Sequence, residues 1–155
     1  MAFEPRVTEA RLALNLISST EMPRLAWEAL EAGLDGPAIR RLAALEFPTF
    51  FQVREVLPQA MEEMLLAKLD KTAAALQLAK LRAQEILTRN LDPFKHLRDF
   101  EQLWIEADYC RDLQDYGNLD DEVHIARSMR QTEQEIRAWL MERLKKLTAA
   151  VNSGG

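Results

Sequence analysis

The sequence has few of the residues that punctuate loop-rich or β-sheet proteins. It contains five glycines and six prolines in 155 residues, and no run of alternating β-branched residues that would be typical of a strand. Good helix formers dominate instead, namely Ala, Leu, Glu, Arg, Lys and Gln. This composition argues against a loop-rich or all-β chain and favours an all-α one.

Cysteine and long apolar runs are scarce as well. Cys110 is the single cysteine, so no disulfide can form within the chain, and a lone cysteine fits a reducing compartment. No window approaches the roughly 18 consecutive apolar residues of a membrane-spanning helix. The opening residues MAFEPRVTEAR lack the basic start and apolar run of a secretory signal. We therefore expect a cytoplasmic protein with no membrane span.

The apolar residues that are present recur at helical spacing. With 48% hydrophobic residues the chain can build a core without a metal or disulfide, and its length fits one domain. We predict a single all-α domain over residues 1–151, an irregular bundle of six to eight short helices, followed by a disordered tail at 152–155. The predicted helices cover 5–17, 20–32, 37–46, a segment opening at Thr49 that Pro58 kinks or divides, 71–89, and three segments that open near Pro93, Asp120 and Thr132. The spacing predicts capping boxes at Ser18 with Glu21, Thr49 with Gln52 and Thr132 with Glu135, and Asn90 suits a left-handed helix end.

The clearest punctuation lies between Trp27 and Glu46. Gly33 suits the left-handed residue that ends a helix, and Pro37 suits the first position of the next helix. Two short helices joined in this way also resemble a helix-turn-helix DNA-binding motif, in which Arg40 and Arg41 would face the groove. The second helix is short, however, and the net charge of −5 disfavours phosphate binding, which needs a basic face. DNA binding is therefore the alternative hypothesis.

Residues that could hold a metal or attack a substrate are few. Asp121 and His124 lie three residues apart, but a di-carboxylate metal bundle needs Glu-x-x-His twice, and zinc sites need closely spaced Cys or His pairs. His96 and His124 are unpaired in the sequence, and no glycine-rich oxyanion or phosphate loop accompanies Cys110. We therefore expect neither an enzyme nor a cofactor, unless the fold brings His96, His124 and Cys110 together.

The acidic residues are distributed unevenly. Between Glu101 and Glu122 the chain has eight acidic residues against one base, Arg111. On a continuing helix, Asp108, Asp112 and Asp115 would share one face, where like charges destabilise the helix by a few tenths of a kcal/mol per pair. The sequence thus predicts a face that docks a basic partner and gains association rate and specificity from charge. The predicted contact residues are Asp108, Asp112, Asp115, Asp120, Asp121, Glu122 and Tyr116.

Most of the aromatic residues are expected in the core. This prediction covers Trp27 and the adjacent pair Phe50 and Phe51, of which one can lie nearer the surface because neighbouring helical residues point about 100° apart. Tyr109, Tyr116 and Phe47 are candidates for the rim of an interface, where aromatic residues are enriched.

One block resembles a known group of proteins. The residues Trp27-Glu28-Ala29-Leu30-Glu31-Ala32-Gly33, with Asp35, Pro37, Arg40 and Leu42-Ala43, resemble a group of short bacterial all-helical proteins of no known activity, as does Asp92-Pro93-Phe94. The resemblance implies a small bacterial cytoplasmic protein, an accessory or immunity-type partner of another gene product, and it carries no catalytic residue. Pro58 and the long connection from Asp108 to Glu122 depart from the pattern. The predicted function is non-enzymatic protein interaction, immunity- or antitoxin-like.

Overall fold

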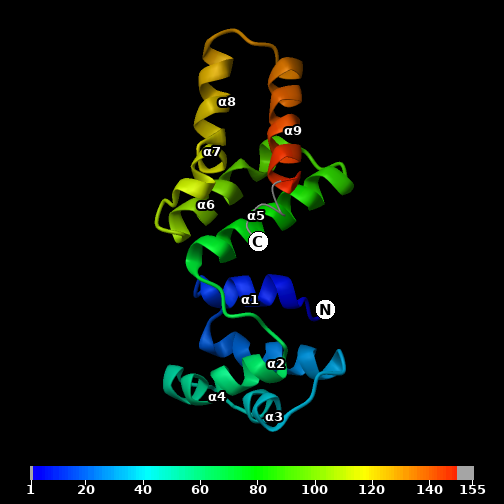
Figure 1. The fold of residues 1–155 in the computed structure, drawn as a ribbon, viewed down its shortest axis with the longest axis vertical. Helices are drawn as coiled ribbons and strands as arrows, with labels where there is room; N and C mark the ends of the chain where they lie inside the picture. The colour runs from blue at the N-terminus through cyan, green and yellow to red at the C-terminus, as the bar shows by residue number, and fades with distance from the viewer. Residues whose placement is uncertain (1, 150–155) are drawn as a thin grey trace. The chain divides into compact units, whose positions relative to one another are not determined.

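The structure, a computed structural model, describes residues 2–149, and all regular structure in that range is helical (Figure 1). The predicted all-α class and irregular helical arrangement are confirmed. Contacts divide the chain into two compact units, Met1–Asp70 and Lys71–Gly155, so the single domain ending at residue 151 stays a prediction. The tail at 152–155 lies outside the described residues.

Within its described residues, 2–70, the first unit contains four α-helices and one 3₁₀ turn. Helix α2 packs against α3, and α3 packs against α4. Val53 and Val56 of α4 join Ile39 and Leu42 of α3 in a shared core. The elements are α1 (Pro5–Ala13), η1 (Ser19–Glu21), α2 (Met22–Glu31), α3 (Pro37–Ala43) and α4 (Phe50–Glu63).

Left-handed residues set the ends of these helices. Gly33 has φ 92°, and the N–H of Leu34 donates to the carbonyl of Ala29 at 3.0 Å, so the predicted glycine cap is confirmed. Asn15 takes the same role with φ 59°, which ends α1 at Ala13 although apolar spacing predicted a helix to residue 17.

The capping predictions in this unit have mixed outcomes. The capping box of Thr49 and Gln52 is confirmed in full at the start of α4, and Pro58 lies inside that helix. The predicted box at Ser18 is wrong, because its hydroxyl contacts the side chain of Glu21 at 3.2 Å and makes no capping bond to the backbone.

The second unit is built on the long helices α5 and α9, which pack against each other. Ala75, Ala79 and Ala83 recur every fourth residue of α5 and are fully buried, and such small side chains let a neighbouring helix approach closely. Helix α6 packs against α5 and α8. The elements are α5 (Lys71–Thr88), η2 (Pro93–His96), α6 (Leu97–Glu106), η3 (Arg111–Leu113), α7 (Gln114–Gly117), α8 (Leu119–Ser128) and α9 (Glu133–Ala149).

Residue types that favour helix ends also form caps in the second unit. Asn90 is left-handed, with φ 52°, and the Asp92 carboxylate accepts the N–H of Phe94 at 3.1 Å. Thr132 accepts the N–H of Glu135 at 3.1 Å. The Glu135 side chain contacts the Thr132 hydroxyl at 3.0 Å.

Several aromatic residues predicted to be buried lie at the surface. Trp27 is 56% exposed, Phe50 62% and Phe51 73%, so the core prediction is wrong for Trp27, and both members of the phenylalanine pair are exposed. Their neighbours Ala26 and Val53 take the inward positions instead. The first unit thus carries much of its aromatic surface facing solvent.

A candidate acidic interaction surface

The acidic segment from Glu101 to Glu122 is not one helix. Helix α6 ends at Glu106, and Asp108 and Tyr109 both adopt left-handed backbone conformations, with φ 56° and 57°. The N–H of Tyr109 closes the helix by donating to the carbonyl of Trp104 at 2.8 Å. The prediction that Asp108, Asp112 and Asp115 share one helix face is therefore wrong, because the chain turns away before Asp112.

Trp104 holds this turn in place. Its indole Nε1–H donates to the carbonyl of Cys110 at 2.9 Å, and its ring meets that of Tyr109 edge-on, with centroids 5.0 Å apart. A Cβ built at Gly117 would come within 2.5 Å of the same indole. Two consecutive left-handed residues other than glycine cost about 1–2 kcal/mol each, and the contacts of Trp104 offset part of that cost.

The two short turns that follow separate buried from exposed side chains. Leu113 is fully buried and Tyr116 is 9% exposed, whereas Asp112 and Asp115 are exposed. Asp112 lies on η3 and Asp115 in the first turn of α7. The burial of Leu113 and Tyr116 thus fixes the direction in which the two carboxylates point.

Tyr116 is buried and is therefore unsuited to the partner contact that was predicted for it. Its ring belongs to the core, and burial raises its pKa above 10.0, with Asp115 adding to the rise and Arg143 opposing it. Tyr109 is instead the exposed tyrosine of the segment, at 60%. The residue type alone, on which both tyrosines were predicted to lie at an interface, does not distinguish the buried one from the exposed one.

Few of the predicted contact acids are neutralised by their own chain. Asp108 pairs with Lys71 at 3.4 Å, an exposed pair that contributes little stability. Within residues 2–149, Asp112, Asp115 and Asp121 have no Lys or Arg at ion-pair distance. Their negative charge is therefore left to solvent or to a partner.

A shallow depression of about 360 Å³ lies between α6 and the start of α8. Asp120, Asp121 and Glu122 lie in the first turn of α8, where the helix dipole favours negative charge, so a structural role already accounts for these three acids. The α6 side of this depression was not predicted from the sequence, although three closely spaced polar residues on one helix, Arg98, Glu101 and Gln102, could have indicated it. The lining residues are Arg98, Glu101, Gln102, Asp120 and Asp121.

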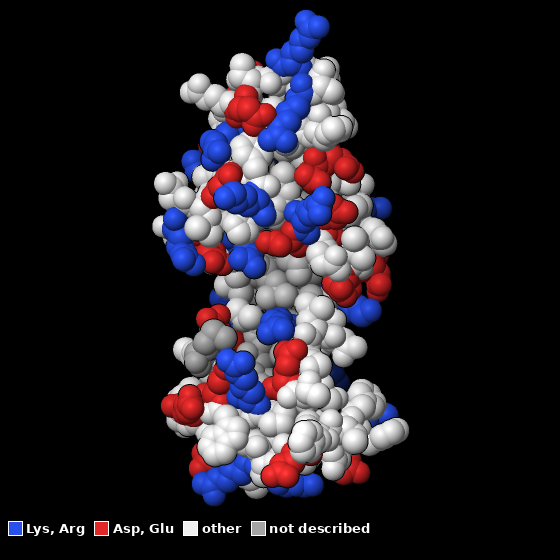
Figure 2. Space-filling model, turned by 180° about the vertical axis from the view of Figure 1, so that it is seen from behind, with Lys and Arg blue, Asp and Glu red and all other residues white. Residues whose placement is uncertain are grey.

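Charged side chains of both signs are mixed on one face of the second unit. On the face shown in Figure 2, acidic and basic side chains of the second unit lie side by side. That face therefore carries no uniform negative charge, and an acidic interaction surface on it would be a cluster of limited extent.

The helix-turn-helix alternative depends on the corner between α2 and α3. Arg40 binds Asp35 through two contacts, Nε at 2.8 Å and Nη2 at 2.6 Å. The hydrogen bond from Arg40 lowers the pKa of Asp35, and the same pair raises the pKa of Arg40. One of the two predicted groove-facing arginines is thus engaged by its own chain, whereas Arg41 is exposed.

The candidate metal and nucleophilic residues make separate contacts. His96 Nδ1 lies 3.1 Å from Asp99 Oδ2, His124 is exposed on α8 and Cys110 is half-buried. Among residues 2–149, no group of three or more His, Cys, Asp or Glu side chains could hold a metal ion. Within the same residues, no helix combines the length and hydrophobicity needed to cross a membrane.

Comparison with known proteins returns no match, whether by family model, among curated proteins or among solved structures. The resemblance of the block beginning at Trp27 to short bacterial helical proteins therefore stays a prediction.

Proposed function

We propose that the protein acts by binding another protein, and that a cluster of acids in its second unit docks a basic partner. We call Asp108, Tyr109, Asp112 and Asp115 the acidic surface. The observation that carries the proposal is the placement of Asp112 and Asp115, which are exposed and have no ion pair within residues 2–149. Buried Leu113 and Tyr116 hold their turns against the core.

The acidic surface combines the two kinds of contact that protein interfaces use. Tyr109 supplies an exposed aromatic ring, held against Trp104, and aromatic residues are enriched among the side chains that dominate binding energy. The carboxylates of the acidic surface would accelerate encounter with a basic partner and disfavour acidic ones. Binding should therefore weaken as salt screens the carboxylates.

The biological role that fits this surface is immunity- or antitoxin-like neutralisation of a basic protein in the bacterial cytoplasm. Such a role needs occupancy of a partner surface and no catalytic group on this chain. It is supported by the local negative charge and by the resemblance of the block beginning at Trp27 to short bacterial helical proteins. The DNA-binding alternative lacks comparable support because Arg40 is bound to Asp35.

The test is affinity capture from the native host at low salt, followed by elution at high salt and mass spectrometry. A double variant, Asp112→Asn with Asp115→Asn, removes two charges from the acidic surface. The matched control, Glu55→Gln with Glu62→Gln, removes two exposed charges from α4 in the other unit. We expect a basic protein to elute from the parent and the control, and about tenfold less of it to bind the acidic-surface variant. Equal capture by both double variants would contradict the assignment.

A further inference from the structure

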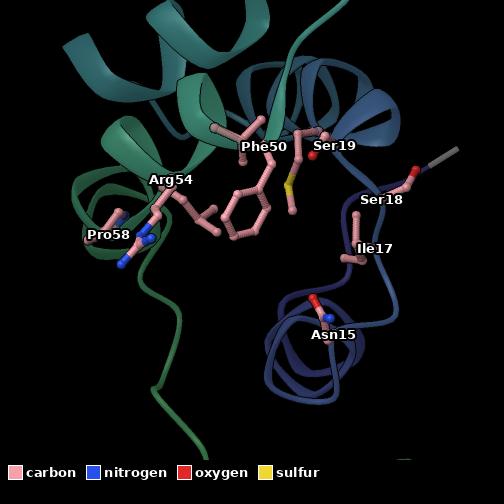
Figure 3. A pocket seen from close by; sticks show the side chains of 10 residues that line it. Asn15, Ile17, Ser18, Ser19, Phe50, Arg54 and Pro58 are labelled. Carbon is pink, nitrogen blue, oxygen red and sulfur yellow. The ribbon is translucent and has the colours of Figure 1, made fainter.

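A groove of about 460 Å³ opens in the first unit. It lies between the first half of α4 and the connection that joins α1 to α2 (Figure 3). Its volume falls in the range of roughly 300–1,000 Å³ that is typical of small-molecule sites. The lining residues are Asn15, Ile17, Ser18, Ser19, Met22, Phe50, Val53, Arg54, Leu57 and Pro58.

The floor of the groove is part of the hydrophobic core. Ile17, Met22 and Val53 are 8%, 5% and 4% exposed and belong to the core cluster of this unit. Phe50 directs its ring into the groove (Figure 3), and it is 62% exposed. An apolar ligand could therefore bury both its own surface and that of Phe50, at about 25 cal/mol for each Å² removed from water.

Arg54 is the one charged side chain among the lining residues. It lies on α4 one turn beyond Phe50, and no carboxylate within residues 2–149 is at ion-pair distance from it. Three other arginines of this unit do have such partners, in the pairs Arg11–Glu21, Arg24–Glu28 and Arg40–Asp35. Arg41 shares the lack of an ion pair within residues 2–149 but does not line the groove. An exposed guanidinium beside an apolar groove matches a carboxylate, which it can bind through two parallel hydrogen bonds.

We propose that this groove binds a small amphiphile, an apolar chain or ring that carries a carboxylate. The apolar part lies over Ile17, Met22 and Val53 beside Phe50, and the carboxylate lies at Arg54. This site lies in the first unit and is separate from the acidic surface.

Decanoate is a suitable probe for the full-length protein, measured by isothermal titration calorimetry below its micellar concentration. Decanol, with the same chain and no charge, tests the head group. We expect saturable one-to-one binding of decanoate and about tenfold weaker binding of decanol. Arg54→Gln should weaken decanoate about tenfold, to the level of decanol, while leaving decanol binding unchanged. The matched control, Arg41→Gln, removes an exposed arginine that does not line the groove and should bind both probes as the parent does.

Three results would overturn the proposal. The first is a failure of decanoate to saturate the folded protein, with folding verified by circular dichroism. The second is equal loss of decanoate binding in Arg54→Gln and Arg41→Gln, which would show that Arg54 acts only through the net charge of the protein and not by contacting the carboxylate. The third is co-sedimentation with phosphatidylglycerol vesicles in the absence of decanoate binding, which would assign the groove to an anionic lipid surface and not to a free ligand.

Discussion

The carboxylate of Glu63, in the last turn of α4, accepts the backbone N–H of Ile39 at 2.9 Å and that of Ala38 at 3.2 Å. These N–H groups belong to the first turn of α3, where the helix itself provides no acceptor. The residue before α3 is Gly36, which has no side chain to cap them. A Cβ at Gly36 would overlap the Glu63 carboxylate, so the glycine makes room for a cap supplied by another helix.

Replacing Glu63 with Ala should lower the free energy of unfolding of the first unit by about 1–2 kcal/mol. The change removes an acceptor for two N–H groups in a partly buried position, which costs about as much as the loss of an N-cap. Glu62→Ala is the matched control, because Glu62 is the exposed neighbour and surface changes usually stay within about 0.5 kcal/mol. Urea unfolding followed by circular dichroism measures both variants. Equal destabilisation by the two would show that the cap contributes nothing.

Signals confined to a few residues are the ones that the sequence predicts well. Gly33, Asn90 and the pair Thr49–Gln52 each act within one helical turn, so their residue types are enough to place a cap. The Glu63 cap joins positions 24 residues apart in the sequence. No local pattern indicates such a contact, because it depends on how α3 and α4 pack.

The candidate site likewise has features that the sequence predicts and features that it does not. The acidity between Glu101 and Glu122 is visible in the sequence, but its geometry depends on a turn at Asp108 and Tyr109 that contains no glycine. Asp tolerates the left-handed conformation better than most residues, yet Tyr does not, so nothing local predicts two such residues in succession. Continuing the helix through this turn led to the wrong face. Tyr116 was chosen because aromatic residues are enriched at interfaces, and its residue type does not reveal that it is buried.

Gly117→Ala should destabilise the second unit by about 1–3 kcal/mol, the usual cost of overpacking a core. The added Cβ would meet the Trp104 indole at 2.5 Å, and that indole also bonds to the carbonyl of Cys110. A shift of Trp104 would therefore loosen the turn that presents Tyr109. Capture of the basic partner should fall along with stability.

A double-mutant cycle identifies the contact responsible. In a Trp104→Leu background the smaller side chain leaves room for the new methyl group, so Gly117→Ala should cost about 1 kcal/mol less than in the parent. Unfolding in urea gives both differences. Strict additivity of the two changes would rule out the Trp104 contact as the cause.

Tyr116 should make the second unit sensitive to alkaline pH. Burial raises the pKa of its phenol in the folded protein above the ordinary value of 10.0, so the folded state holds this proton more tightly than the unfolded chain does. Stability from this group is fully present below about pH 9 and decreases once the unfolded chain begins to lose the proton near pH 10. The decrease continues until the pH passes the raised pKa of the folded state.

The variant that tests this is Tyr116→Phe, which keeps the ring in the core and removes the titrating group. Its free energy of unfolding should fall less steeply between about pH 9 and 11 than that of the parent, whose slope from this one group can approach about 1.4 kcal/mol per pH unit. Tyr109→Phe is the control, because it removes the one other tyrosine and leaves the buried phenol in place. Lysine titration is common to all three proteins and cancels in the comparison. If Tyr109→Phe flattened the profile as much as Tyr116→Phe does, burial of Tyr116 could not be the source of the pH dependence.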